Sequence, residues 1–127
     1  MDAEFKIFSL ADVPETPMPE GRGIQKHMVN SGCGTEKIDV HLNVLRVGEP
    51  GGRYHSHTGS DNVYIVKSGE GTLVHEGMTH AIKRDDVIYI PAGHKHTLTT
   101  SGADPLELFE IYTPAGKNFD FALEEEN

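Results

Sequence analysis

Residues 87–96 read VIYIPAGHKH and combine an apolar run, a turn and a pair of histidines. Pro91 ends the predicted strand because its nitrogen has no hydrogen to donate to a sheet, and Gly93 permits a tight reversal. His94 and His96 then lie at the start of the next predicted strand. The stretch therefore predicts a strand, a sharp turn and a second strand that carries imidazoles.

Short apolar runs separated by turn residues extend over most of the chain. The turn signals recur about every 8 to 12 residues, which is typical of antiparallel sandwiches and barrels, and they lie at 68–71, 76–78, 84–86 and 101–105. No segment repeats apolar residues at helical spacing over three turns. The sequence predicts an all-β fold with strands at 35–47, 54–57, 62–67, 72–75, 79–83, 87–90, 95–100 and 106–112, and edge strands at 6–10 and 23–29.

The predicted strand 35–47 has the cleanest alternation. One face carries the aliphatic residues Ile38, Val40, Leu42 and Val44, and the other carries Asp39, His41 and Asn43. The apolar pattern changes phase after Val44, which predicts a bulge or a bend near there. Residues 13–23 contain three prolines, so we expect an extended arm without a regular ladder.

Composition excludes several classes of protein. The 127 residues are the size of one domain, and 11 Lys and Arg against 20 Asp and Glu give a net charge of −9. This charge argues against nucleic acid and anionic membrane surfaces as partners. Cys33, the single cysteine, excludes an intramolecular disulfide, and no apolar stretch is long enough to span a bilayer. We expect a soluble, cytoplasmic protein.

Histidine is the exceptional residue in this composition. Six of the 8 histidines fall between positions 55 and 96. His55 and His57 are two residues apart, so in a strand both side chains leave the same face of the sheet. Neutral imidazole is the commonest metal ligand in proteins, and this pair therefore indicates a metal site on a strand.

Three stretches together resemble the two motifs of the cupin superfamily. They are GRYHSH at 52–57, VYIVKSGEG at 63–71 and DVIYIPAGHKH at 86–96. The resemblance covers about residues 38–115. It implies a single-domain double-stranded β-helix, a jelly-roll barrel, with its core at about 36–114. Residues 1–35 would form N-terminal strands and the proline-rich arm, and 115–127 a tail.

The resemblance also implies a divalent metal ion (Fe, Mn, Zn or Ni) at the barrel mouth, bound by His55, His57 and His96. Asn62 stands where the family has a fourth, glutamate ligand. Three arrangements stay open: Asn62 binds through its carbonyl oxygen, Asp61 turns in, or the site has histidine ligands alone, which we favour. The alternative to all three is that the chain has lost the metal site. Asp85 likewise replaces a usual glycine. Cupins of this size are often homodimers, and we expect the same here.

Four further residues are candidates for the pocket. His41 lies on the strand before the first motif and is either a pocket residue or a solvent residue. Tyr64 lines a pocket or packs in the barrel. Arg53 either binds a substrate carboxylate or pairs with a surface acid. Glu110 shares strand parity with the apolar residues Leu106 and Leu108, so it is a candidate buried general base.

These residues predict a metal-dependent enzyme that acts on a small polar organic substrate at a three-histidine site. A dioxygenase-type reaction is the leading expectation. Isomerase or lyase chemistry stays open, as does a module that binds or senses a sugar or an organic acid without turnover.

Overall fold

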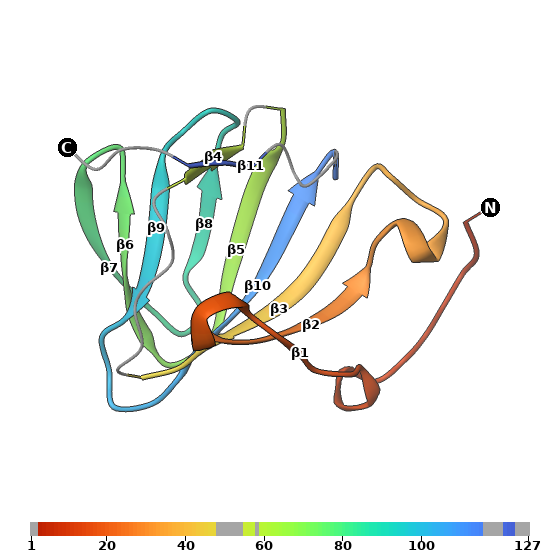
Figure 1. Ribbon diagram of the computed structural model, residues 1–127, viewed down its shortest axis with the longest axis horizontal. Helices are drawn as coiled ribbons and strands as arrows, with labels where there is room; N and C mark the ends of the chain where they lie inside the picture. Colours follow the sequence, from red (N-terminus) through yellow and green to blue (C-terminus); the bar gives the residue numbers. More distant parts are fainter. Residues whose placement is uncertain (1–2, 48–54, 58, 116–120, 124–127) are drawn as a thin grey trace.

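The computed structural model describes residues 3–47, 55–57, 59–115 and 121–123, without the side chains of His57 and of residues 121–123. These residues form two antiparallel sheets that face one another as a barrel (Figure 1). The all-β prediction is confirmed. No helix among the described residues is long and apolar enough to cross a membrane.

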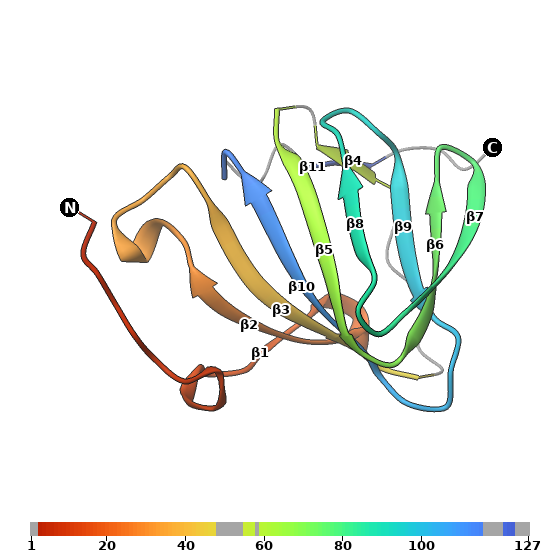
Figure 2. The same cartoon turned by 180° about the vertical axis from the view of Figure 1, so that it is seen from behind.

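The larger sheet has six strands in the order β1-β2-β3-β10-β5-β8. Their bounds are β1 Thr16–Pro17, β2 Gly23–Val29, β3 Asp39–Leu45, β5 Asp61–Ser68, β8 Val87–Ile90 and β10 Leu106–Thr113. The smaller sheet has the order β11-β4-β9-β6-β7. Its strands are β4 His55–His57, β6 Glu70–His75, β7 Met78–Lys83, β9 His96–Thr100 and β11 Phe121–Leu123. Both views place β4 and β11 across one end of the barrel (Figures 1 and 2).

The N-terminal region differs from the expectation in two respects. Residues 6–10 form no strand. They lead instead into a 3-10 turn, Leu10–Asp12, capped by the Ser9 hydroxyl. The proline-rich arm contains a 3-10 turn, Pro19–Gly21, and it also supplies β1, whose two residues pair with Gln25 and Ile24. Pro17 is tolerated there because β1 is a sheet edge. A third 3-10 turn spans Ser31–Cys33.

The inward face of β3 is the polar one. Asp39, His41, Asn43 and Leu45 are all buried, whereas Val40 and Val44 are half-buried on the other face. The predicted bulge near Val44 is wrong, since β3 pairs with β10 without a break from Asp39 to Leu45. The phase change in the sequence arises because polar residues occupy the interior at one end of the strand and Leu45 occupies it at the other.

The interior is therefore filled unevenly. Its apolar core is built from both sheets and comprises Leu45, Tyr64, Val66, Leu73, Ile82, Ile90, Leu98, Leu106 and Leu108. The polar residues of β3 lie beyond one end of this core. That end also carries β4 and the turns that follow β6 and β8, and we call it the histidine end (Figure 1).

Two of the turn positions with a left-handed backbone conformation, which glycine adopts without steric cost, bear on the sequence predictions. Gly93 has φ of +86°, as the reversal predicted before His94 requires. Asp85 has φ of 73° in the turn between β7 and β8. The family resemblance places a glycine at position 85, and this conformation gives the physical reason.

Candidate metal centre

His55 and His96 meet at the histidine end. They are register partners on β4 and β9, and their ring centroids lie 4.3 Å apart. His96 is only 1% exposed. Its Nδ1 lies 3.0 Å from the backbone oxygen of His94, so this nitrogen carries the proton and Nε2 of the neutral ring carries the lone pair. Two of the three predicted imidazoles are thus brought together, and His96 is oriented as metal-binding histidines are.

The third predicted imidazole, that of His57, follows His55 on the same strand, but its side chain lies outside the described residues. Arg53 lies outside them altogether. Among the side chains that the structure describes, no group of three or more His, Cys, Asp and Glu is arranged to hold a metal ion. Since His57 is not in that set, the three-histidine site stays a prediction.

Asp61 and Asn62, the two candidates for a fourth ligand, have different roles. Asp61 Oδ1 accepts a hydrogen bond from Ala92 N at 3.0 Å, which ties the start of β5 to the turn after β8. Asn62 faces inward and is 1% exposed. Its Nδ2 donates to Glu110 Oε2 at 2.9 Å, and its Oδ1 is a buried oxygen that accepts no hydrogen bond from the described residues.

A second histidine pair stands beside the first. His75 Nε2 lies 2.9 Å from His94 Nδ1, and the two rings stack with centroids 5.1 Å apart. His75 is also the register partner of His96 on β6 and β9, so both side chains extend from the inner face of the smaller sheet. Sequence reasoning does not find this pair, because His75 flanks a turn and nothing in the sequence shows that β6 lies next to β9.

Glu110 is buried, as its parity with the two leucines predicts, and is 4% exposed. Its Oε1 accepts hydrogen bonds from His41 Nε2 at 3.0 Å and Asn43 Nδ2 at 2.7 Å. Its Oε2 accepts from Tyr112 Oη at 2.5 Å in addition to Asn62. A carboxylate with these donors is an anion whose lone pairs are already in use.

His41 lies between two carboxylates. Its Nδ1 contacts Asp39 Oδ1 at 2.8 Å, while Nε2 donates to Glu110. Burial opposes the charge on His41, but the hydrogen bonds to Asp39 and Glu110 outweigh it and raise the pKa of His41 to about 9. Burial likewise raises the pKa of Glu110, yet the His41 hydrogen bond and charge, with the Tyr112 hydrogen bond, bring that pKa well below its usual range. The triad is an imidazolium between two acids.

Tyr64 connects this network to the histidines. It is 2% exposed, its ring centroid lies 6.2 Å from that of His96, and it is the register partner of Glu110 on β10. Burial and the nearby Glu110 charge raise the pKa of Tyr64 well above its usual value. The phenol therefore stays protonated at neutral pH, and its ring lies close to that of His96.

We call the set Asp39, His41, Asn43, Asn62, Tyr64, Glu110 and Tyr112 the polar wall. Sequence reasoning did not assign Asp39, Asn43 or Tyr112 to the site. The alternation of Asp39, His41 and Asn43 on one face was the available signal, but it does not show which face is inside. The register supplies that information, because His41 pairs with Glu110 and Glu110 with Tyr64 across β3, β10 and β5.

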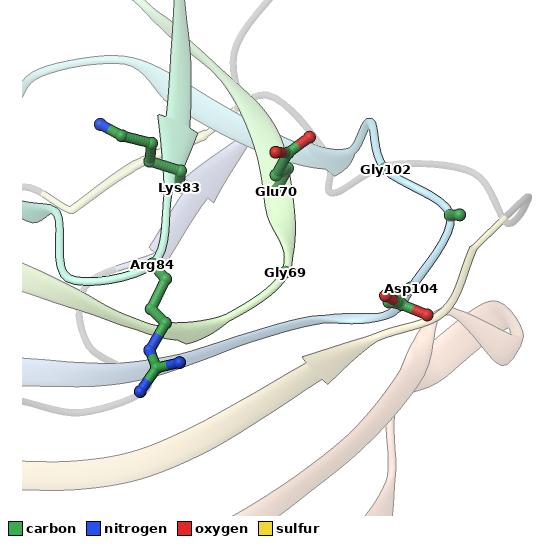
Figure 3. Close-up of a pocket in the computed structure, with 7 residues that line it drawn as sticks. Gly69, Glu70, Lys83, Arg84, Gly102 and Asp104 are labelled. Carbon is green, nitrogen blue, oxygen red and sulfur yellow. The ribbon is translucent and has the colours of Figure 1, made fainter.

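A cleft of about 450 Å³ lies at the other end of the barrel. It is lined by Gly69, Glu70, Lys83, Arg84, Gly102, Ala103 and Asp104, and the close-up shows side chains of both charges around its rim (Figure 3). Lys83 also forms an ion pair with Asp86 at 3.6 Å. The mixture of charges on exposed loops favours neither anions nor cations, so this cleft adds nothing to the candidate site.

The fold and the paired histidines define a cupin. The Cupin_2 family model, described as a cupin domain, matches residues 41–112, which span β3 to β10. The chain belongs to this family. A comparison with curated proteins found no match.

Solved structures agree with the fold. An uncharacterized conserved protein with a double-stranded β-helix domain from Klebsiella pneumoniae is 24% identical, with a TM-score of 0.77, covering 97% of this chain and 100% of that one. A predicted oxalate decarboxylase from Thermotoga maritima is 20% identical, with a TM-score of 0.78, covering 86% and 99%. A polyketide cyclase from Streptomyces resistomycificus is 16% identical, with a TM-score of 0.82, covering 98% and 88%. The last two proteins are named for different reactions, and a likeness of fold alone does not fix the reaction.

Proposed function

We propose that the protein is a metal-dependent cupin enzyme in which His55, His57 and His96 bind a divalent metal ion, with a small polar organic molecule as substrate. The observation that carries the proposal is the pairing of His55 with His96 on adjacent strands, with the Nδ1 proton of His96 engaged by the His94 carbonyl. This arrangement fits Fe, Mn, Zn or Ni, all of which accept neutral imidazole ligands.

The bound ion would supply a Lewis acid or an oxygen-activating centre. The chain itself supplies a buried polar wall next to His96. Tyr64, protonated at neutral pH, is available to position a polar group of a substrate, and the expected dioxygenase-type or isomerase and lyase reactions both need such positioning. The choice among these reactions is part of the proposal.

The surroundings of Glu110 bear on its proposed catalytic role. A general base works best when its pKa lies near the working pH, whereas hydrogen bonds lower the pKa of Glu110 far below that range. Its lone pairs are also engaged by neighbouring side chains. These observations favour a positioning role for Glu110 over proton abstraction.

The test is metal analysis of protein purified without chelators, for the wild type and for His96→Ala. His80→Ala is the matched control, because it also removes one imidazole but from the exposed face of β7. We expect near-stoichiometric metal in the wild type and in His80→Ala and a small residual fraction in His96→Ala. Equal metal content in all three proteins would contradict the proposed centre.

One observation favours a second candidate, a cupin that binds or senses a sugar or organic acid without turnover. The buried carboxylate that the structure describes next to the centre is saturated with donors and is a poor base. Asn62→Glu, which restores the family carboxylate, separates the two functions. Tighter metal binding, with turnover absent from both proteins across oxygenase, isomerase and lyase substrates, would support the binding function.

We also propose that the protein is a homodimer. Phe5 and Ile7 are 89% and 86% exposed on the segment before the first 3-10 turn. Among the described residues, the adjacent β2 pairs on its outer side only with the two residues of β1, so most of that edge is available to a second strand. A second copy of the chain would cover both features. The cytoplasmic location also stays a prediction.

A further inference from the structure

Asn62 is held in one orientation by Glu110. A carboxylate accepts hydrogen bonds and donates none, so the amide must present Nδ2, its donor, to Glu110. Oδ1, on the other branch of the same planar group, is then turned away from β10. Glu110 is itself fixed on its other oxygen by His41 and Asn43.

The oxygen that results has no hydrogen-bond donor in the part of the chain that the structure describes. Asn62 is 1% exposed, and Oδ1 receives no hydrogen bond from the described residues. Leaving a polar atom in this state costs about 1–3 kcal/mol. A ligand that carries positive charge or a hydrogen-bond donor would remove the penalty, so the geometry indicates that this oxygen faces a bound group.

The position of Asn62 indicates the end of the barrel at which that group would lie. Asn62 and Tyr64 both face inward from β5, and the ring of Tyr64 lies 6.2 Å from that of His96. Asn62 is nearer than Tyr64 to the histidine end. It directly follows Asp61, whose side chain accepts a hydrogen bond from the turn before His96.

We propose that Glu110 is a positioning residue that keeps the Asn62 oxygen turned toward a cation bound by the histidines. In the family, a glutamate carboxylate contacts the metal directly. In this chain the Glu110 carboxylate would instead lie behind Asn62, with the Asn62 amide between it and the ion. This inference rests on the proposed metal centre. Residues that orient a ligand in this way typically change metal affinity by about 10- to 100-fold when removed.

Glu110→Gln tests the orientation with almost no change of volume. We expect the Gln oxygen to stay with His41 and Asn43, which both donate to the Glu110 oxygen at that position, so the Gln NH₂ faces Asn62 and Tyr112. A tyrosine hydroxyl can accept as well as donate, but the Asn62 NH₂ cannot accept. Asn62 must rotate its amide, and it then presents NH₂ to the centre.

A second substitution reverses this effect. In the double variant Glu110→Gln with Asn62→Asp, the Gln NH₂ donates to one oxygen of the Asp carboxylate, and the other oxygen again faces the centre. The pair keeps the net charge of the wild type with donor and acceptor exchanged. Recovery of Co²⁺ affinity in the double variant would show that the orientation of the side chain at position 62 controls the affinity, since a second substitution does not repair a general loss of packing.

The experiment is a titration of each metal-free protein with Co²⁺, followed by the visible absorption of the bound ion, with urea unfolding measured in parallel. We expect Glu110→Gln to bind Co²⁺ at least about tenfold more weakly than the wild type, with an altered spectrum. We expect the double variant to return to within about threefold of the wild type, since it again offers an oxygen ligand.

Glu107→Gln is the matched control. It makes the same change on β10, but at a half-buried carboxylate that contacts Ser68 and Lys67 and is not part of the polar wall, so Co²⁺ affinity should stay within about threefold of the wild type. If Glu110→Gln binds as tightly as the wild type, or the double variant stays as weak as Glu110→Gln, the inference is wrong and the metal centre stands. If the wild type binds no Co²⁺, both are wrong.

Discussion

His41 on β3 and Glu110 on β10 are directly opposite one another, and the imidazole Nε2 donates to the carboxylate at 3.0 Å. The other imidazole nitrogen contacts Asp39, so one cation is shared by two buried acids. Without the His41 cation, the burial of either carboxylate would be strongly unfavourable, because an unpaired charge in the protein interior has a large desolvation cost. The stability of the barrel should therefore depend on the charge of His41.

The first prediction concerns pH. The groups that face His41 are Asp39, Glu110, Tyr112 and His27. The pKa of His41 rises from 6.5 to about 9 in the folded state, so its contribution to stability is complete below pH 6.5 and is lost as the pH rises through 9. One pKa unit corresponds to about 1.4 kcal/mol. Urea unfolding of the wild type should show this decline between pH 6.5 and 9.

His41→Gln should flatten that part of the stability profile, because Gln has no proton to lose. The wild type and His41→Gln would be compared at several pH values in the same buffer series. Parallel profiles for the two proteins would show that another group causes the decline.

A second prediction concerns Tyr112, whose hydroxyl donates to Glu110. Tyr112→Phe keeps the ring and removes this hydrogen bond to a charged group, so it should lower the free energy of unfolding by about 1.5–3 kcal/mol. Tyr89→Phe is the control, since Tyr89 is 61% exposed and should change stability by less than about 0.5 kcal/mol. Equal effects in urea unfolding would mean that the Tyr112 hydroxyl contributes no special stability.

A third prediction tests the apolar half of the interior. Leu108 has no exposed surface, so Leu108→Ala should lower the free energy of unfolding by about 2–5 kcal/mol through lost burial and the cavity left behind. Val87→Ala, at a side chain that is 68% exposed, should have little effect. Thermal unfolding of both variants measures the difference, and a stable Leu108→Ala protein would contradict the core as described.

A fourth prediction follows from the proposed metal centre. An ion that binds only the folded protein raises its stability, by about 2.7 kcal/mol at a free concentration 100 times the dissociation constant. EDTA should therefore lower the melting temperature of the wild type but leave that of His96→Ala unchanged. A melting temperature of the wild type that does not respond to EDTA or to added Zn²⁺ would count against the centre.

A fifth prediction tests the homodimer. A charge at Phe5 or Ile7 should weaken an interface that covers these side chains. Light scattering during size-exclusion chromatography should give twice the chain mass for the wild type and the chain mass for Phe5→Asp with Ile7→Asp. A control with Glu4→Gln leaves the apolar side chains in place and should remain dimeric. A monomeric wild type would exclude this assembly.

Most of the fold was predictable because its signals are local. Pro91, Gly93 and the regular spacing of turns place the predicted strands of the barrel within two residues, except that the strand predicted from residue 35 begins at Asp39. The strand predicted at 6–10 is wrong because a short apolar alternation does not reveal whether a neighbouring strand exists. Which face of β3 is buried depends likewise on its partners, and the His41 and Glu110 side chains that meet there are 69 residues apart in the chain.

The candidate site was predictable to a similar extent. The pairing of His55 with His96 agrees with what the family resemblance implies, and the burial of Glu110 agrees with its strand parity. The partners of Glu110 were not predictable, because Asn43, Asn62 and Tyr112 become its donors only through the order β3-β10-β5. The same reason applies to His75 and His94, whose contact depends on β6 lying next to β9.

The division of the interior into an apolar half and a hydrogen-bonded half has a consequence for molecular recognition. Each side chain of the polar wall is fixed by neighbours on other strands, so a ligand entering the histidine end meets groups that have already lost their rotational freedom. Binding there loses little conformational entropy, and its selectivity comes from matching a rigid pattern of donors and acceptors. A molecule with one polar group out of place leaves a buried atom unsatisfied, and the barrel has little freedom to adjust to it.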